Sequence, residues 1–251
     1  MIIVKSPREI ALMKEAGEVL IELFDVLKEN TVPGKTTKEL DKIANRFILS
    51  KGGYPSSKGY EGYPGSICIS VNDTLIHGIG SNKIILKEGD IVSYDCMCTK
   101  HGYVADATRT YGVGKISEEA QRLIDTTEEC FFNAVKLVKP GVHLGDISHE
   151  IERTAKDQGY TLTELYTGHG VGKEVHEDPY VPNVGKAGTG IILREGMSIA
   201  IEPMVNSGKV DLITLDDGWT VKTKDGKLCC HYENTVVVTK TGNEIITLKK
   251  E

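Results

Sequence analysis

The sequence predicts an α+β fold built from two related halves, about residues 1–115 and 116–251. Two observations carry this prediction. In each half, two stretches with helical spacing are followed by short runs typical of strands. Segments of the second half also repeat segments of the first at a nearly constant offset. Helices that precede strands, and do not alternate with them, are typical of helices that cover one face of a curved antiparallel sheet.

The internal repeat is clearest in two glycine-containing segments. The segment "LKEGDIVSYD" at 86–95 resembles "LREGMSIAIE" at 193–202, 107 residues later. Farther on, "DAT" at 106–108 resembles "ENT" at 233–235, and an insertion has enlarged the offset to 127. This period is far longer than that of solenoid repeats, so it favours two fused, two-fold-related halves. The offset of 107 also aligns Pro33, Gly34 and Gly52 with Pro140, Gly141 and Gly159.

The helices are predicted from capping residues and apolar spacing. The first begins after Ser6, with Pro7 at the first helical position and Glu9 completing a capping box. Apolar residues then recur at helical spacing to about residue 30. Gly52 and Gly159 end the second helix of each half. The other predicted helices span 37–51, 117–138 and 145–158.

The strands are predicted from short runs rich in apolar and β-branched residues. In the first half they are "ICISV" (67–71), "DIVSYDCMC" (90–98) and "YVADATRTYGVG" (103–114). In the second half they are "MSIAIEPMV" (197–205), "GWTVKTK" (218–224) and "CCHYENTVVVT" (229–239).

Composition excludes several classes of protein. The net charge is −6 and basic residues form no dense run apart from the terminal "LKKE", so DNA is not an expected partner. No apolar run approaches the roughly 20 residues of a membrane span, and the apolar start is too short for a signal peptide. We therefore expect a cytoplasmic protein without a membrane partner. Its six cysteines are then expected to be buried thiols.

Four acidic residues occupy strand positions with apolar neighbours, where an unpaired carboxylate is costly. Asp95 and Glu202 are related by the repeat, as are Asp106 and Glu233, so the two-fold arrangement brings all four into the crevice between the halves. Carboxylates this close stay ionised together only if cations neutralise them, which indicates two divalent metals. One imidazole from "GHGVG", His169, completes an oxygen-rich set that suits manganese, iron, cobalt or zinc.

With these motifs, and with "VHEDP" and "IEPMV" around them, nearly the whole chain resembles the type I methionine aminopeptidases, of the M24 or pita-bread metallopeptidases. The resemblance implies a pita-bread fold with two pseudo-two-fold halves, acting as one catalytic domain over 1–251. It also implies a dinuclear centre that activates a water molecule, with Glu202 as general base. The metal ligands that it implies are Asp95, Asp106, His169, Glu202 and Glu233.

The resemblance implies further roles in substrate binding. His77 and His176 match two histidines that contact substrate without binding metal, and His176 is expected to stabilise the oxygen that becomes negative. A thioether side chain suits a soft, aromatic-lined slot. The residues that match the methionine pocket are Tyr60, Tyr63, Cys68, Val175 and Trp219. Glycines beside His169 are expected to let the backbone pass close to the metals.

The implied activity is removal of the N-terminal methionine from nascent proteins and peptides by a monomeric enzyme. Members without an N-terminal extension also associate transiently with the ribosome. Two alternatives stay open: an aminopeptidase or dipeptidase of the same fold that cleaves before proline, and a metal-free binding paralogue. Cleavage of Met-Ala-Ser, of Ala-Pro-Ala or of neither separates the three.

The chain departs from the family pattern at "CCHYENT", where His231 replaces a glutamine. In a continuous strand His231 points to the same side as Glu233, so it either hydrogen-bonds a metal ligand or lies at the surface. Met97, Ser57 and Val175 also differ from common family residues. These changes concern the shape of the pocket and the surroundings of the ligands.

Overall fold

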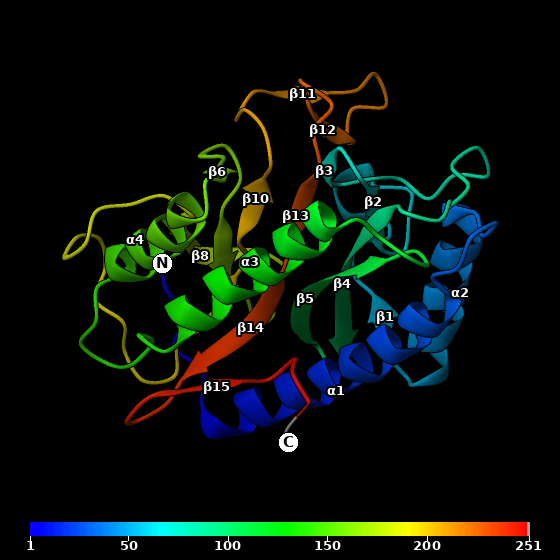
Figure 1. Cartoon of the computed structure of the whole chain (residues 1–251). Coiled ribbons are helices and arrows are strands. Elements are labelled where there is room, and N and C mark those ends of the chain that lie inside the picture. Colours follow the sequence, from blue (N-terminus) through cyan, green and yellow to red (C-terminus); the bar gives the residue numbers. More distant parts are fainter. Residues whose placement is uncertain (250–251) are drawn as a thin grey trace.

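The computed structural model describes residues 1–249 and has the predicted α+β architecture. The helices lie on one side of a curled sheet, with α1 and α2 toward one edge and α3 and α4 toward the other (Figure 1). The described helices are α1 (Pro7–Asn30), α2 (Thr37–Ser50), α3 (Glu118–Val135) and α4 (Leu144–Asp157), with one 3₁₀ turn, η1 (Tyr60–Gly62).

The large sheet is antiparallel throughout and has the strand order β1-β4-β5-β14-β9-β7-β8, with β2 beside β4 and β15 beside β14. Its strands are β1 (Tyr54–Pro55), β2 (Cys68–Val71), β4 (Ile91–Lys100), β5 (Tyr103–Gly112), β7 (Gly168–Gly170), β8 (Glu177–Val181), β9 (Ser198–Ile201), β14 (Glu233–Val238) and β15 (Asn243–Ile245).

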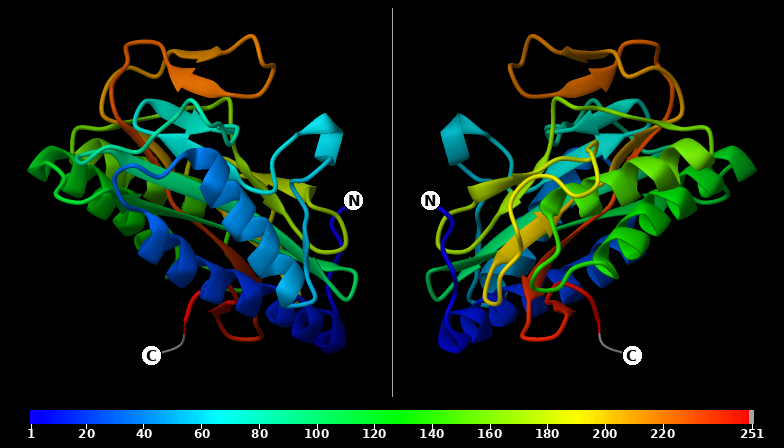
Figure 2. Two further views of the ribbon diagram at one scale, coloured as in Figure 1. Left: turned by 90° about the vertical axis from the view of Figure 1, so that its right-hand side faces the viewer. Right: turned by 90° about the vertical axis from the view of Figure 1, so that its left-hand side faces the viewer.

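Two three-stranded sheets adjoin the large one. The first has the order β13-β10-β6 and the second the order β11-β12-β3. Figure 2 shows that β11 and β12 project at the end of the molecule opposite to α1. The strands are β3 (Thr74–Ile76), β6 (Thr161–Leu162), β10 (Met204–Asn206), β11 (Leu212–Thr214), β12 (Val221–Thr223) and β13 (Cys229–His231).

The two-fold relation of the halves is visible in matching backbone hydrogen bonds. In the first half Gly34 donates to the carbonyl of Leu86, and in the second Gly141 donates to that of Leu193. The offset between these pairs is the 107 residues of the sequence repeat. Gly34 and Gly141 have nearly the same positive φ, 89° and 91°, which glycine adopts without a Cβ clash. The repeat therefore marks equivalent turns between the two helices of each half, and each turn is bonded to the segment that precedes β4 or β9.

The helix predictions are confirmed in position and differ at their ends. Helix α1 begins at Pro7 with the predicted capping box between Ser6 and Glu9. Helix α3 ends at Val135, three residues before the predicted end at 138. There Val138 donates to the carbonyl of Val135 three residues back, so the last predicted turn tightens and leaves the α-helix.

Two predicted strands are each divided in the structure, and the two breaks lie next to each other in the fold. The run 197–205 splits into β9 and β10 around Pro203, which lacks an N–H to donate to a neighbouring strand. The run 229–239 splits into β13 and β14 at Tyr232, whose N–H bonds the carbonyl of Pro203 at 3.2 Å. The two segments thus cross side by side between the large sheet and the sheet of β13, β10 and β6. Glu202 and Glu233 lie at this crossing.

Each pair of helices covers its own part of the core. Leu20 of α1 and Ile48 of α2 belong to one buried cluster, which includes Tyr94 of β4. Phe131 of α3 and Ile147 of α4 belong to another, under the strands of the second half. All six cysteines are buried free thiols, as predicted.

Arg109 ties the two halves together beneath the sheet. Its side chain is buried, and its guanidinium donates to the carbonyl of Glu233 at 2.6 Å and to that of Thr247 at 3.0 Å. The same group lies over the rings of Phe24 and Tyr232, with centroid distances of 5.0 and 4.6 Å. Arg109 therefore fixes the start of β14 from below.

We expect Arg109→Met to lower the free energy of unfolding by about 3 kcal/mol, because buried acceptors lose a charged donor. Urea denaturation measures this. Lys28→Ala is the matched control, since this exposed lysine lies 5.9 Å from the centroid of the Tyr111 ring. The control is expected to change stability by at most about 0.5 kcal/mol. Equal effects of the two changes would contradict the structural role of Arg109.

Candidate active site

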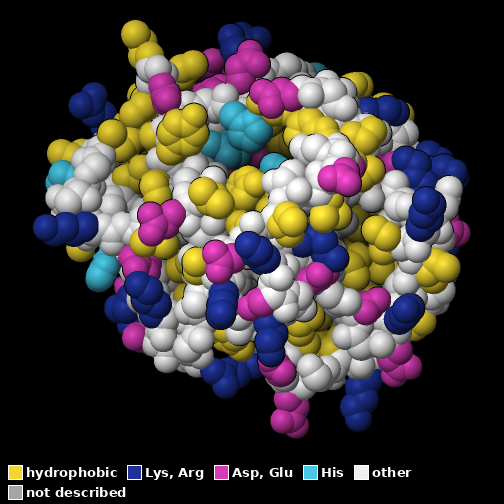
Figure 3. Space-filling view, turned by 90° about the horizontal axis from the view of Figure 1, so that it is seen from above, with side chains coloured by type: hydrophobic (Ala, Val, Ile, Leu, Met, Phe, Trp, Pro, Cys, Tyr) yellow, Lys and Arg dark blue, Asp and Glu magenta, His cyan; other side chains and the backbone are white. Residues whose placement is uncertain are grey.

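A cavity of about 650 Å³ opens on the face that carries β11 and β12, and residues of both halves line it. Seen from above, histidine side chains lie in a hollow bordered by hydrophobic and acidic side chains (Figure 3). Among the described residues no lysine or arginine lines the cavity. The predicted site residues that line it are Tyr60, Tyr63, Cys68, His77, Asp95, Asp106, His169, His176, Glu202, Trp219 and Glu233.

Strand register brings the acids of three strands into one row. Thr108 of β5 pairs with Asp95 of β4 on one side and with Glu233 of β14 on the other. Residues directly opposite in a sheet point to the same face, so the two carboxylates share a face with the Thr108 hydroxyl. Asp106 lies two residues before Thr108 and points the same way. The Thr108 hydroxyl donates to Glu233 Oε2 at 2.8 Å and fixes that carboxylate.

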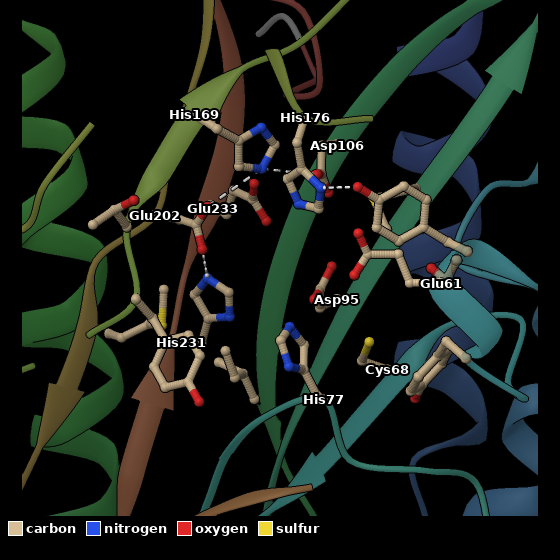
Figure 4. A pocket seen from close by; sticks show the side chains of 18 of the residues that line it. Glu61, Cys68, His77, Asp95, Asp106, His169, His176, Glu202, His231 and Glu233 are labelled. Atoms are coloured by element: carbon tan, nitrogen blue, oxygen red, sulfur yellow. Dashed lines mark hydrogen bonds and ion pairs between the residues drawn. The ribbon is translucent and has the colours of Figure 1, made fainter. Parts of the chain in front are cut away.

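His169 lies in the middle of β7, which pairs with β9. Its Nδ1 is 2.9 Å from the carbonyl oxygen of Gly170, so its Nε2 faces the acids (Figure 4). The distances from Nε2 to Asp106 Oδ2 and to Glu202 Oε1 are both 3.6 Å. Side chains from β7, from β5 and from the residue that follows β9 therefore meet at one imidazole.

The donor set fits a divalent cation. Ligand atoms of Asp106, His169 and Glu233 lie within 4.8 Å of one another, and all three residues are buried. Asp106 Oδ1 and Glu233 Oε1 are buried without a hydrogen-bond partner among the described residues. Burial raises the pKa of Asp106 well above its usual range, and the neighbouring carboxylates raise it further. Burial likewise raises the pKa of Glu202 and of Glu233. A bound cation would supply the missing partners and remove the repulsion.

The two other predicted histidines face the cavity from different elements. The hydroxyl of Tyr60 is 2.7 Å from His176 Nδ1, and the His176 ring lies edge-on to His169 at 4.3 Å between centroids. His77 has a positive φ of 58° and stands edge-on to Trp219 at 5.9 Å between centroids. Burial lowers the pKa of His77 to about 4 and also lowers that of His176, so both rings are neutral at pH 7.

An apolar and aromatic wall adjoins the carboxylates. Tyr63 is buried, donates its hydroxyl to the carbonyl of Gly78 at 2.8 Å, and packs edge-on against Trp219 at 5.1 Å between centroids. Cys68 pairs with Asp95 in the sheet and lines the same wall. Val175 does not line the cavity. It belongs to a buried cluster against which Tyr60 packs, so it supports the wall from behind.

Besides the predicted close approach to the metals, the glycines beside His169 have a reason in the packing of the sheet. A Cβ on Gly168 would lie 2.3 Å from the carbonyl oxygen of Ala200 in β9. A Cβ on Gly170 would lie 2.1 Å from that of Asp178 in β8. The glycines let β7 fit between its neighbours, and this close fit holds the imidazole in place.

An ion pair that braces the His176 loop was not predicted from the sequence. Lys5 Nζ lies 2.5 Å from Glu177 Oε2, with both side chains at most 4% exposed. The other oxygen, Glu177 Oε1, accepts from the N–H of Lys173 at 2.8 Å. Lys5 and Glu177 are 172 residues apart in the chain, and local patterns carry no information about such a contact. Glu61, also unpredicted, lines the cavity with an exposed carboxylate.

Over residues 1–249, no helix combines the length and the apolar character that crossing a bilayer requires.

Comparison with known proteins places this site in a family. The model of metallopeptidase family M24 matches residues 11–240. The methionine aminopeptidase of Clostridium perfringens is 52% identical over 251 residues, which is the full length of both chains. Methionine aminopeptidase 1 of Bacillus subtilis is 46% identical, over 98% of this chain and 99% of the relative.

Solved structures agree with these matches. The methionine aminopeptidase of Thermotoga maritima has a TM-score of 0.97 and 41% identity, over 99% of this chain and 100% of that one. The prolidase of Pyrococcus furiosus has a TM-score of 0.79, over 99% of this chain and 66% of that one. At 24% identity, the prolidase shows a shared pita-bread fold alone. The family match over most of the chain, together with the buried histidine and carboxylates, leads to one conclusion: the chain belongs to metallopeptidase family M24.

Proposed function

We propose that this chain removes the N-terminal methionine from peptides and nascent proteins. The observation that carries the proposal is the cavity itself, where buried carboxylates and His169 adjoin a wall of Tyr63, Cys68 and Trp219. The carboxylates suit cations, and the wall suits a thioether. The relatives named methionine aminopeptidase support this activity over cleavage before proline.

The proposed metal ligands are Asp95, Asp106, His169, Glu202 and Glu233, holding two divalent ions of cobalt, manganese, iron or zinc. When bound, such ions polarise a carbonyl and lower the pKa of water. The carboxylates that face the cavity also attract the free amine of a substrate. This attraction makes the enzyme an exopeptidase.

The remaining steps belong to residues of the chain. Glu202 accepts the proton of the attacking water. With Tyr60 donating to Nδ1, the neutral His176 ring carries its proton on Nε2 and donates it in a hydrogen bond to the developing oxyanion. His77 contacts the amide nitrogen of the second residue. Tyr60, Tyr63, Cys68 and Trp219 enclose the methionine side chain, with Val175 behind them.

We further propose that residues 1–251 act as one catalytic domain, as a cytoplasmic monomer that meets nascent chains in transient contact with the ribosome. The high coverage of the relatives supports a single domain.

The expected substrate preference is cleavage of Met-Ala-Ser and not of Ala-Pro-Ala, with manganese or cobalt present. Liquid chromatography of the products measures this. Cleavage of Ala-Pro-Ala alone would favour a proline-specific enzyme, and cleavage of neither would favour a binding paralogue.

For His176→Ala we expect kcat to fall about 10²- to 10³-fold while metal binding is unchanged, since this is the cost of removing one oxyanion donor. Steady-state kinetics and metal analysis of the same sample test this. Tyr60→Phe removes only the hydroxyl bonded to His176 Nδ1 and is expected to have a smaller effect. Loss of metal from His176→Ala would contradict the assigned role.

A further inference from the structure

His231 stands inside the cavity and is not one of the ligands implied by the family pattern. It is the last residue of β13, directly before the break at Tyr232, and its side chain is 3% exposed. It lines the cavity on the side of the acids, beside Glu202 (Figure 4). Of the two positions that the sequence left open for His231, the structure therefore has the one beside a proposed metal ligand and not the one at the surface.

The Nε2 atom of His231 is buried and has no hydrogen-bond partner among residues 1–249. It lies 3.4 Å from Glu202 Oε2. The approach does not have the geometry of a hydrogen bond, since Nε2 stays without a partner. A buried ring nitrogen in this state lacks the partner that buried polar atoms normally have.

His169 has the same relation to the other oxygen of Glu202. Its Nε2 lies 3.6 Å from Glu202 Oε1. Two ligands that share a cation, each about 2.0–2.2 Å from it, are themselves roughly 3–3.6 Å apart. Glu202 thus presents one carboxylate oxygen to each imidazole at the spacing of shared ligands.

We propose that His231 is an additional nitrogen ligand of the metal centre, sharing a divalent cation with Glu202 Oε2. The inference rests on the proposed metal centre and adds a second imidazole to it. The competing interpretation is a hydrogen bond from His231 that merely orients Glu202. A glutamine at 231 could keep such a hydrogen bond, but its amide would be a poor ligand for these ions.

A second imidazole also changes metal preference. Carboxylate sets suit manganese, whereas imidazole suits zinc and iron better. Loss of His231 should therefore weaken binding of zinc more than binding of manganese.

The experiment titrates metal-free protein with cobalt, zinc and manganese chlorides by calorimetry. It compares the full-length wild type with His231→Gln and His231→Leu. We expect both variants to lose at least about tenfold in cobalt affinity, the lower end of what changes around metal ligands cost. His149→Gln, at an exposed position on α4, is the control and should bind like the wild type. X-ray absorption of the cobalt-loaded wild type should show two imidazoles at the centre, which requires no variant to fold.

Wild-type affinity in His231→Gln, with weakened binding only in His231→Leu, would identify a hydrogen bond and overturn the proposal. Wild-type affinity in both, or one imidazole by X-ray absorption, would also overturn it. His169→Gln separates this failure from that of the proposed function. If His169→Gln binds metal normally, the whole proposed centre is wrong, whereas normal binding in the His231 variants alone refutes only the added ligand.

Discussion

Asp106→Asn is expected to abolish metal binding and lower kcat/KM at least about 10³-fold, because several kcal/mol of transition-state stabilisation depend on the cation. Asp106 has one oxygen beside His169 and another, Oδ1, that has no hydrogen-bond partner within the described part of the chain. An amide keeps the shape of the side chain but removes its negative charge. Metal content by mass spectrometry and cleavage of Met-Ala-Ser are measured on the same preparation.

In the absence of metal, we expect Asp106→Asn to be more heat-stable than the wild type, although it is less active. The pKa of Asp106 is raised in the folded chain by burial and by like charges. When folding raises the pKa of a carboxyl group, ionisation of that group destabilises the folded state relative to the unfolded state. The penalty is absent below the unfolded pKa of about 3.9 and grows as pH rises through the folded value. At pH 7 the amide therefore removes this ionisation penalty.

Thermal denaturation with and without manganese checks this. The wild type should gain heat stability from manganese, and Asp106→Asn should not. Asp25→Asn, exposed on α1, is the control and should behave like the wild type in both conditions. Normal metal binding by Asp106→Asn would remove Asp106 from the proposed ligands.

Gly170→Ala is expected to lower the free energy of unfolding by about 3 kcal/mol and to impair metal binding as well. The new Cβ would lie 2.1 Å from the carbonyl oxygen and 2.7 Å from the carbonyl carbon of Asp178. These are backbone atoms of β8, which pairs with β7, so the strands must separate. That movement displaces His169, the adjacent residue. Urea denaturation and metal titration measure the two effects.

Gly242→Ala is the matched control, because among the described residues a Cβ there would meet no atom within 4 Å apart from its chain neighbours, and φ is not positive. We expect a change within about 0.5 kcal/mol. If Gly170→Ala were as stable and as active as the control, close strand packing would not explain the glycine beside His169.

Much of the fold could be predicted because its signals are local. Ser6 and Glu9 identify the start of α1, and the repeat relates the turns at Gly34 and Gly141. The breaks at Pro203 and Tyr232 were not predicted. The run "CCHYENTVVVT" has strand character throughout, and its division depends on a hydrogen bond to a carbonyl 29 residues earlier in the chain.

The sequence by itself determined the fold class, the repeat and the acidic and histidine residues that are candidates for the site. It could do so because periodicity, capping and residue type are properties of neighbouring positions. The tertiary structure decided which of these side chains meet. It turned His231 toward Glu202, set Val175 behind the cavity wall, and paired Lys5 with Glu177. Such contacts depend on how strands that are far apart in the chain are arranged in space, and no local sequence pattern contains this arrangement.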